Sequence, residues 1–434
     1  MELIIENIRC FAGRHTIPIK PITFLTGENS SGKSTILACL SVINDFGFPL
    51  QPRLNEPPFS LGNFDTIATY KSGRGGRADT FSLGYRRAST GERTLTTILT
   101  EIVAAYTGGG GAVELSRLAC SGGTINALIN IFSVNGKILL EYNISRIGEP
   151  PHHVRYTYES RDTGYDSKSV RLDPSELLLG LYEAVGDEDN DDFKLIRELR
   201  RGIFNATSTT RRGNRTVAIA PIRTKPSRTY DQVAQEFTPE GEHMPFVLPT
   251  LLKNTNAKDA FERFGKDSGL FRQINVRYLG NKTTGSVQVL VTSGGRPANL
   301  IDVGYGVSQA LPVVVESMLV SPERLLLLQQ PEVHLHPRAQ AALGTLFVDL
   351  HAENEKQFVI ETHSDYIIDR VRQEVARGRV EADDVQILYF EKRGSETTVF
   401  PIAIDERGNV VDPPPSYRDF FMEEEINLLS RAKE

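Results

Sequence analysis

A phosphate-loop pattern near the start of the chain restricts the folds that the sequence can adopt. Residues 27–35 read Gly-Glu-Asn-Ser-Ser-Gly-Lys-Ser-Thr, which fits G-x-x-x-x-G-K-[ST]. The apolar stretch 22–26 before them is typical of a strand, and residues 33–45 are typical of a helix. The pattern therefore predicts a strand–loop–helix unit of an α/β fold. The alternative is a glycine-rich turn with an incidental lysine.

The residue types in this loop suit a nucleotide phosphate. Glycines let the backbone wrap an anion where a Cβ would collide or forbid the required φ. Successive N–H groups and the start of the helix attract negative charge. We expect Lys33 to reach the β- and γ-phosphates of ATP, and the Ser34 hydroxyl to bind Mg²⁺. The expected nucleotide-binding residues are Asn29, Ser30, Gly32, Lys33, Ser34 and Thr35.

A second apolar run, the four leucines 325–328, ends in polar residues and predicts a buried parallel strand that opens into a site. In most P-loop ATPases the first polar position is an acid that holds Mg²⁺, and the next is a Glu that polarises the attacking water. Gln329 and Gln330 occupy these positions here, and Glu332 is the nearby carboxylate. We interpret Gln329 as a metal-site residue, with Gln330 and Glu332 as catalytic residues. Glu332 would supply the negative charge, acting on Mg²⁺ or on the attacking water. Alternatively, the two glutamines only position water and turnover is very slow.

A histidine follows the next predicted strand. His363 lies in Glu-Thr-His-Ser-Asp, directly after residues 357–360. A histidine at a strand end can sense or stabilise a γ-phosphate, and its spacing of about 30 residues from the leucine strand fits an ABC switch histidine. His363 is therefore a third candidate catalytic residue, although a lone histidine is more often structural.

A Gly-x-Gly-x-Ser turn precedes the apolar helical run 310–319. Gly304, Gly306 and Ser308 would offer N–H donors and a hydroxyl to an anion at the start of a helix. The turn occupies the place of an ABC signature loop, about 20 residues before the leucine strand. Gly306 and Ser308 are therefore predicted to contact the nucleotide held by a second subunit. The alternative is an ordinary capped helix.

The spacing of these motifs predicts a split domain. At 434 residues the chain has room for about three domains of ordinary size. We expect an ABC-type α/β head formed by residues 1–70 and 275–434, with the strands of a β-rich lobe at 78–160. Residues 161–274 are predicted to form a helical, charged insertion. The glycine-rich segments 72–79 and 107–112 are expected to be loops.

Composition excludes several classes. The net charge of −6 argues against a surface coated with positive charge. The first ten residues do not resemble a signal peptide, and no run of about 18 apolar residues could span a bilayer. Three cysteines without metal-ligand spacing favour reduced thiols. We expect a cytoplasmic protein that does not bind membranes.

Charge is concentrated in the predicted insertion. The basic stretch 197–228 contains nine Lys and Arg residues and could contact nucleic acid, or present a solvated face or a docking surface for an acidic partner. Within it, Arg223 and Arg228 could contact the nucleotide or a dimer partner, or form an ion pair on the insertion. The acidic cluster 187–192 favours a disordered loop over a metal site.

Taken together, these motifs resemble the ABC/SMC-like ATPases of the OLD and RecF group, and above all the single-chain AAA-family ATPases of bacterial antiphage defence. The resemblance is carried by N-x-R-x-F with P-I-T-F-L-T-G-E-N-S-S-G-K-S-T near the start, by Q-P-E-x-H-L-H-P at 330–337, by E-T-H-S-D at 361–365, by A-P-I-R-x-x-P-x-R-x-Y at 220–230 and by Y-R-D-F-F-x-E-E at 417–424. It covers about 1–70 and 215–430. Gln329 departs from the usual acid, and no TOPRIM nuclease domain is expected after the ATPase elements.

The resemblance implies an ATPase that forms at least a homodimer. ATP would lie between the 27–35 loop of one copy and the 304–309 loop of the other. A separate effector, a nuclease or toxin as in Septu-like or PARIS-like pairs, would be controlled by this sensor or scaffold. The alternative is a RecF-like ATPase that binds DNA during repair. A transporter motor fits less well, because nothing in the sequence couples to a membrane.

Overall fold

The chain forms two compact units, each built from separate segments. The computed structural model describes residues 1–71, 76–87, 99–109, 112–122, 125–134, 137–146, 150–158, 195, 197–199, 202–203, 216–231, 236–280 and 285–417. The first unit comprises residues 1–19, 35–215 and 393–397, and the second comprises 20–34, 216–392 and 398–434. Helix α1 (Lys33–Ile43) begins in the second unit and continues in the first.

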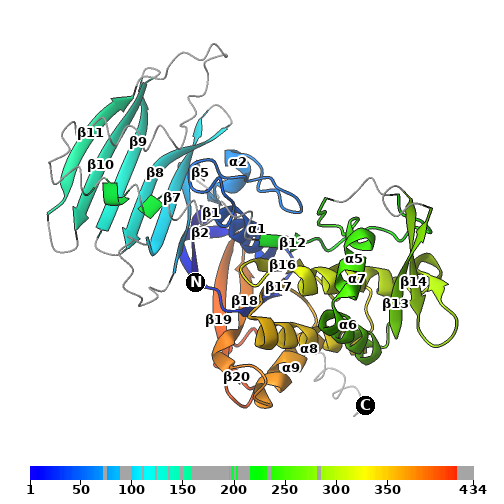
Figure 1. Cartoon of the computed structure of the whole chain (residues 1–434). Helices are drawn as coiled ribbons and strands as arrows, with labels where there is room; N and C mark the ends of the chain where they lie inside the picture. Colours follow the sequence, from blue (N-terminus) through cyan, green and yellow to red (C-terminus); the bar gives the residue numbers. More distant parts are fainter. Residues whose placement is uncertain are drawn as a thin grey trace. The chain divides into compact units, whose positions relative to one another are not determined.

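The first unit is built on an antiparallel sheet of eight strands, in the order β11-β10-β9-β8-β7-β6-β1-β2 (Figure 1). The strands are β1 (Glu2–Ile8), β2 (Phe11–Pro18), β6 (Thr80–Arg86), β7 (Glu101–Gly109), β8 (Ala112–Gly122), β9 (Ile125–Val134), β10 (Lys137–Arg146) and β11 (His152–Tyr158). The unit also contains α2 (Phe64–Ile67), β4 (Tyr70–Lys71) and β5 (Gly76–Arg77). Strands β6 to β11 lie in the region 78–160, where the sequence predicts β-rich structure, and the glycines at 108 and 109 continue strand β7 rather than form a loop.

The second unit contains a seven-stranded sheet in the order β12-β16-β17-β3-β18-β19-β20. Its strands are β3 (Ile22–Gly27), β12 (Thr216–Ile219), β16 (Leu325–Gln329), β17 (Gln357–Glu361), β18 (Val385–Arg393), β19 (Glu396–Ile404) and β20 (Val410–Val411). The five strands from β12 to β18 run parallel. The four leucines of β16 are all buried, as expected for a central strand covered on both faces.

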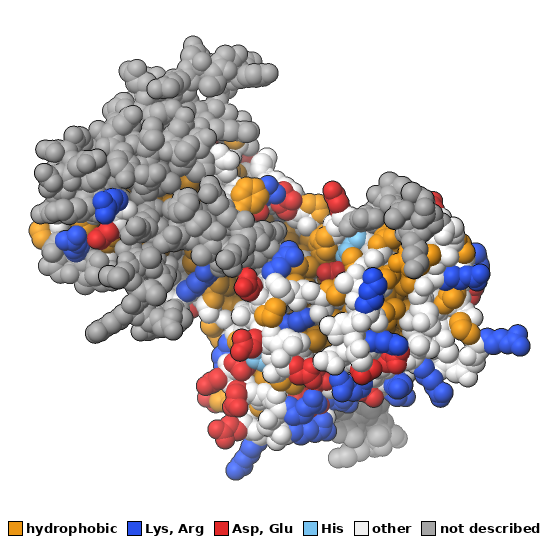
Figure 2. Space-filling model, in the orientation of Figure 1, with side chains coloured by type: hydrophobic (Ala, Val, Ile, Leu, Met, Phe, Trp, Pro, Cys, Tyr) orange, Lys and Arg blue, Asp and Glu red, His pale blue; other side chains and the backbone are white. Residues whose placement is uncertain are grey.

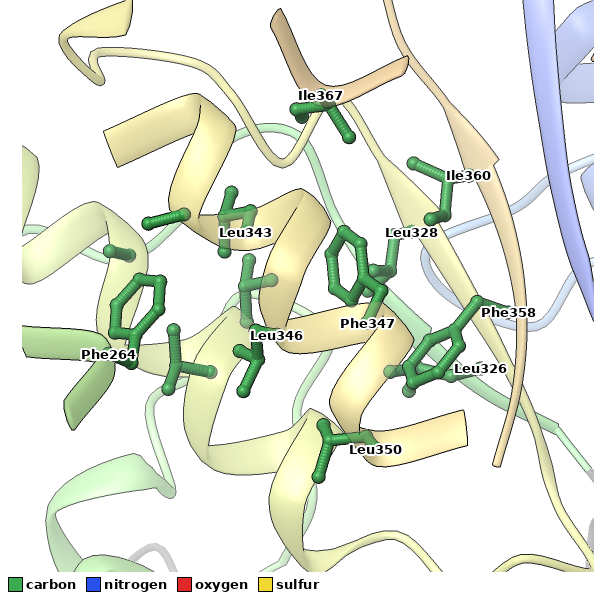
Figure 3. Close-up of a cluster of buried hydrophobic side chains, with 14 of the residues drawn as sticks. Phe264, Leu326, Leu328, Leu343, Leu346, Phe347, Leu350, Phe358, Ile360 and Ile367 are labelled. Atoms are coloured by element: carbon green, nitrogen blue, oxygen red, sulfur yellow. The ribbon is translucent and has the colours of Figure 1, made fainter. Parts of the chain in front are cut away.

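Helices pack against this sheet and complete a continuous core. Figure 3 shows Leu343, Phe347 and Leu350 of α8 (Pro337–Asn354) facing apolar side chains of β16 and β17. The helix starts where the His336 side chain accepts a hydrogen bond from the backbone N–H of Arg338. Helix α9 (Asp365–Ala376) begins at a Ser364 cap. These caps supply partners for otherwise unsatisfied backbone groups at the two helix starts.

A second group of elements packs onto the same core. It comprises α5 (Met244–Lys253), α6 (Thr255–Ser268), α7 (Tyr305–Leu319), β13 (Gln273–Leu279), β14 (Ser286–Thr292) and β15 (Ala298–Asn299), with 3-10 turns at Leu300–Asp302 and Ala382–Asp384. Helix α7 is buried along most of its length. Helix α6 instead buries one stripe, with Phe261, Phe264, Gly265 and Ser268 at helical spacing.

The α/β fold with the phosphate loop between β3 and α1 agrees with the sequence analysis. The structure differs over residues 216–274. We expected them in the insertion, but β12 pairs with β16, and α5 and α6 contribute to the core of the second unit. Apolar faces on both helices explain this, because each must be covered.

Some predictions fall outside the described residues. They include the acidic cluster 187–192, residues 200–201 and 204–215 of the basic stretch, and the part of the 417–424 motif after Tyr417. Among the described helices, none combines the length and the apolar content needed to cross a bilayer.

Replacing Gly265 tests how tightly α6 is packed. Gly265→Ala would ordinarily stabilise a helix by about 1 kcal/mol. Here the new Cβ would lie 2.3 Å from a ring carbon of Phe271 and 2.7 Å from the Phe271 carbonyl oxygen. Overpacking costs about 1–3 kcal/mol, and the backbone carbonyl of Phe271 cannot move away as easily as a side chain. We therefore expect a net loss of stability of about 1–2 kcal/mol in chemical denaturation. Asp259→Ala, at an exposed position of α6, is the control and should change stability by about 0.5 kcal/mol or less. A Gly265→Ala protein more stable than the parent would contradict this packing.

Candidate functional site

The phosphate loop leaves β3 in a conformation that depends on glycine. Gly27 has φ 130°, and a Cβ there would lie 2.3 Å from the carbonyl oxygen of Phe390 on the neighbouring β18. Gly32 also has a positive φ, of 96°. The intervening residues Glu28, Asn29 and Ser30 are exposed to solvent. The loop therefore has the backbone shape that the pattern predicts, and its tip is open to a ligand.

Lys33 is held beneath this loop. Its side chain is buried, and its Nζ donates hydrogen bonds to the carbonyl oxygens of Gly27 at 2.9 Å and Glu28 at 2.6 Å. Burial lowers the pKa of Lys33, while the charges of Glu361 and Glu28 oppose that shift. The ammonium group is thus positioned within the loop by backbone acceptors, which suits a point-charge contact with a phosphate.

Ser34 contacts a carboxylate from a different strand. Its hydroxyl donates to Glu361 at 3.0 Å and 2.8 Å from the two carboxylate oxygens. Gln329 lies opposite Glu361 in the register of β16 and β17, and its Nε2 is 3.5 Å from Oε2 of Glu361, at the outer limit of a hydrogen bond. Ser34, Gln329 and Glu361 therefore meet at the carboxyl ends of neighbouring parallel strands, where open α/β sheets bind ligands.

Glu361 is the site residue that sequence analysis missed. It begins the histidine motif, and the sequence pattern points instead to Glu332 as the carboxylate near Gln329 and Gln330. The available signal was its place at the end of a buried strand, equivalent to that of Gln329 one strand away. What could not be read from the sequence is that β17 lies directly between β16 and β3.

Arg223 fixes the turn that follows β16. Its guanidinium is 3% exposed, and Nη2 donates to the carbonyl oxygens of Gln329 at 3.3 Å and Gln330 at 3.1 Å. Burial lowers the pKa of Arg223 to about 10, against the favourable charge of Glu332. Gln330 has φ 44°, an uncommon backbone region for this residue type, so the turn requires such support.

The two arginines that the sequence analysis weighed together thus have different surroundings. Arg223 is a buried backbone clamp within its own unit. Arg228 forms an exposed ion pair with Asp302, with nitrogen–oxygen distances of 2.7 and 2.9 Å. Both contacts lie within the second unit.

Glu332 joins two loops at the same edge of the sheet. One carboxylate oxygen accepts the backbone N–H of His363 at 2.8 Å. Burial raises the pKa of Glu332, and hydrogen bonds from the His363 backbone and the Thr362 hydroxyl oppose that change, as does the charge of Arg223. A carboxyl group with a raised pKa at a strand end suits a proton acceptor, but this one also has a structural contact.

The His363 ring is exposed beside the phosphate loop. Partial burial lowers the pKa of His363, and the positive charge of Lys33 lowers it further, whereas Glu361 raises it. Both charged groups therefore act on the imidazole, and its lowered pKa favours the neutral form. The backbone N–H of Gln330 donates to the carbonyl oxygen of Glu361, so the first residue of the histidine motif is tied to the turn after β16.

The predicted partner-facing turn is less open than expected. Ser308 is 4% exposed, and its hydroxyl donates to the carbonyl oxygen of Tyr305 at 2.8 Å within α7. Gly306 has little room, since a Cβ would lie 3.0 Å from the carbonyl oxygen of His334. The exposed part of the turn is Asp302, Gly304 and Tyr305. Any contact with a second nucleotide would therefore use the start of the helix rather than the Ser308 hydroxyl in this rotamer.

The remaining predicted ligand, Thr35, belongs to the first unit. It is buried, and its hydroxyl accepts a hydrogen bond from Nη1 of Arg9 at 3.2 Å, within that same unit. In the described parts of the chain, no three acidic, histidine or cysteine side chains group into a metal-binding cluster. A Mg²⁺ ion at Ser34 would accordingly depend on phosphate and water for most of its ligands, which is how Mg²⁺ binds in most nucleotide sites.

A cavity of about 360 Å³ lies elsewhere in the second unit, between α6, α8 and α9. Its charged lining is largely engaged, since Arg338 donates to the carbonyl oxygens of Lys266 and Asp267, and Arg370 to Thr345. Figure 2 shows charged side chains of both signs over these helices. None of the predicted site residues lines this cavity, so we assign it no part in the site.

Two family models for AAA domains match parts of the chain. A family model described as “AAA domain, putative AbiEii toxin, Type IV TA system” matches residues 153–369, half of the chain. A second model, described as “AAA domain”, matches residues 2–66, which include the phosphate loop. No curated protein matches the sequence.

Similar solved structures include heads of SMC proteins. An SMC head bound to the C-winged helix domain of ScpA is 11% identical, with a TM-score of 0.39, covering 93% of this chain and 97% of that one. An SMC head with an extended coiled coil bound to the C-terminal domain of ScpA, from Pyrococcus furiosus, is 11% identical, with a TM-score of 0.38 and coverage of 100% and 99%. The SMC head domain from Thermotoga maritima is 12% identical, with a TM-score of 0.36 and coverage of 93% and 98%.

The clamp on the turn after β16 can be tested by a conservative exchange. Arg223→Lys loses the planar group that reaches two carbonyl oxygens, and buried polar groups left unpaired cost about 1–3 kcal/mol. We expect a loss of stability in that range, measured by chemical denaturation. Arg228→Lys is the matched control and should change stability little, because its ion pair with Asp302 is exposed. Equal effects of the two exchanges would show that burial of Arg223 does not support the turn.

Proposed function

We propose that this chain, which belongs to the AAA-domain family whose model matches residues 153–369, is an ATPase that binds ATP with Mg²⁺. One observation carries the proposal. A loop with exposed residues 28–30 leads to a lysine held by loop carbonyls and to a serine hydroxyl beside a carboxylate. This arrangement offers N–H donors and a cation to phosphates, and oxygen ligands to a metal.

Each residue at the site has a role in this proposal. Lys33 exchanges its two carbonyl acceptors for phosphate oxygens, and Ser34 turns its hydroxyl oxygen towards Mg²⁺. Bound Mg²⁺ neutralises charge on the phosphates and orients them for attack. Glu332 accepts a proton from the attacking water, with Gln330 positioning that water, and His363 contacts the γ-phosphate as a neutral imidazole.

We further propose that ATP is shared between two copies of the chain. The 27–35 loop of one copy and the start of α7 in the other would enclose the nucleotide. The exposed turn at Asp302, Gly304 and Tyr305 supports this, because it leaves the start of a 15-residue helix accessible. ATP then favours the closed dimer only by as much as it binds that state more tightly than the open one.

The biological role that fits these properties is control of a separate effector. A site with glutamines at 329 and 330 should hydrolyse ATP slowly, so that the closed dimer is long-lived. A long-lived state suits a sensor or scaffold that holds a nuclease or toxin until a signal arrives. The resemblance to antiphage ATPases and the toxin–antitoxin wording of the matched family both support this role. The effector would be a separate protein.

A RecF-like role in DNA repair has less support. The described basic residues of the stretch 197–228 are Arg197 and Lys225, which are exposed, and Arg223 and Arg228, which have partners. Arg223 is buried against backbone carbonyls, and Arg228 is paired with Asp302. The face in Figure 2 carries both signs of charge rather than a continuous basic surface. ATP-dependent, salt-sensitive binding of DNA by the purified chain would nevertheless favour this alternative.

Nucleotide binding is tested by removing the buried ammonium. Lys33→Ala deletes a charge-assisted contact with phosphate, which is worth about 1.5–3 kcal/mol or roughly 10- to 100-fold in affinity. We expect the Kd for ATP, measured by calorimetry, to rise by that factor. Lys20→Ala serves as control, because Lys20 forms an ion pair with Asp383 and lies before β3. Unchanged ATP affinity in Lys33→Ala would refute the proposed phosphate contact.

Turnover and dimerisation are tested through Glu332. Glu332→Gln keeps an oxygen acceptor for the His363 backbone N–H and removes the proton-accepting carboxylate. We expect ATP turnover to fall about 100-fold or more, as for loss of a general base, with ATP affinity within a few fold of the parent. Native mass measurement with ATP and Mg²⁺ should then show a dimer that persists longer than that of the parent.

Two results would count against this part of the proposal. Parent-like turnover in Glu332→Gln would remove Glu332 from catalysis and leave it as a link between loops. A nucleotide-loaded protein that stays monomeric at all concentrations would refute the shared site, while leaving ATP binding to a single copy intact.

A further inference from the structure

The second unit contains a buried carboxylate that the roles above do not use. Glu361 is 7% exposed, and it ends β17 between the strands that carry Gln329 and the phosphate loop. Burying a carboxylate is costly unless cations or hydrogen-bond donors surround it. Its carboxylate accepts hydrogen bonds from the Ser34 hydroxyl and, more weakly, from the Gln329 amide. A carboxylate at this position requires an explanation.

We propose that Glu361 supplies the carboxylate of the magnesium site, in place of the acid that position 329 lacks. The inference rests on the proposed function, because the ion would arrive with ATP. Gln329 is neutral and cannot balance a divalent cation. Glu361 lies opposite Gln329 in the register of β16 and β17. The carboxylate is therefore on the neighbouring strand, at the same edge of the sheet.

The contact with Ser34 supports this assignment. A hydroxyl that donates its proton to a carboxylate keeps its oxygen lone pairs available for a metal, and the donation increases their negative character. Both Glu361 oxygens accept from Ser34, at 3.0 and 2.8 Å, so the carboxylate orients the hydroxyl. Ser34 itself is exposed. The pair therefore presents an oriented oxygen to the same space that the phosphate loop borders.

The charges around the pair are consistent with a site that gains a cation. The negative charge of Glu361 acts on both Lys33 and His363 and opposes the lowering of their pKa values. When Lys33 turns to phosphate, Glu361 remains beside a nucleotide that carries several negative charges. In the absence of a metal these charges repel one another. Glu361 thus makes tight ATP binding conditional on a divalent cation.

Glu361→Gln tests the inference without measuring turnover. The probe is a non-hydrolysable ATP analogue, and the readout is its Kd by calorimetry, with Mg²⁺ and with EDTA. In the parent, Mg²⁺ should tighten binding. In the variant we expect about 10- to 100-fold less gain from Mg²⁺, the usual cost of losing a group that supports a metal. Affinity in EDTA should stay equal or improve, because a negative charge beside the phosphates is gone.

Two variants complete the test. The exchanged pair Gln329→Glu with Glu361→Gln returns the acid to β16 and should recover most of the Mg²⁺ gain, which also decides the case if the single variant does not fold. Glu323→Gln removes an exposed carboxylate before β16, outside the site; it is the matched control and should keep the full Mg²⁺ gain. Electron paramagnetic resonance of Mn²⁺ bound together with the analogue should rank the parent and the variants in the same order as their gain in affinity from Mg²⁺.

The outcomes separate this inference from the function on which it rests. If the parent fails to bind the analogue under either condition, the proposed ATP site is refuted. If the parent gains affinity from Mg²⁺ and Glu361→Gln gains as much, Glu361 is not part of the magnesium site, while ATP binding stands. Weaker binding of the variant in both Mg²⁺ and EDTA would point to a purely structural Glu361 and would also overturn the inference.

Discussion

The hydrogen bonds between Ser34 and Glu361 join residues 327 positions apart, and the geometry of the candidate site depends on them. They exist because β16, β17 and β3 are adjacent parallel strands whose carboxyl ends lie together. A buried carboxylate is stable there only with donors or cations at hand. The sheet therefore does more than carry the phosphate loop. Its strand order determines which side chains face the loop and which charge they carry.

The turn after β16 depends in a similar way on a residue that is distant in the chain. Arg223 follows β12, the strand beside β16, and its buried guanidinium donates to two carbonyl oxygens of that turn. Gln330 adopts a positive φ within it, and Glu332 faces the next loop. A clamp of this kind limits backbone movement close to the phosphate loop. Because its hydrogen bonds go to backbone atoms, it places little restriction on the side chains at 329 and 330.

The presence of the carboxylate on β17, at Glu361, rather than on β16 has a chemical consequence. The edge of the sheet keeps its negative charge at Glu361, so cation binding can persist although Gln329 is neutral. The position that usually polarises water is Gln330, and the remaining carboxylate, Glu332, holds a backbone N–H of the next loop. In our proposal, metal binding and water activation therefore rest on different strands and loops. Such a separation is compatible with a protein that holds its nucleotide for long periods.

The local patterns were sufficient for the elements themselves. Four consecutive leucines predicted a buried strand, and Gly27 to Thr35 predicted strand, loop and helix, because such patterns depend on backbone geometry within a few residues. The sequence could not indicate that Glu361 reaches Ser34, that Arg223 binds backbone carbonyls, or that Ser308 turns into its own helix. Those contacts follow from strand order, register and burial, which arise only when distant segments pack against one another.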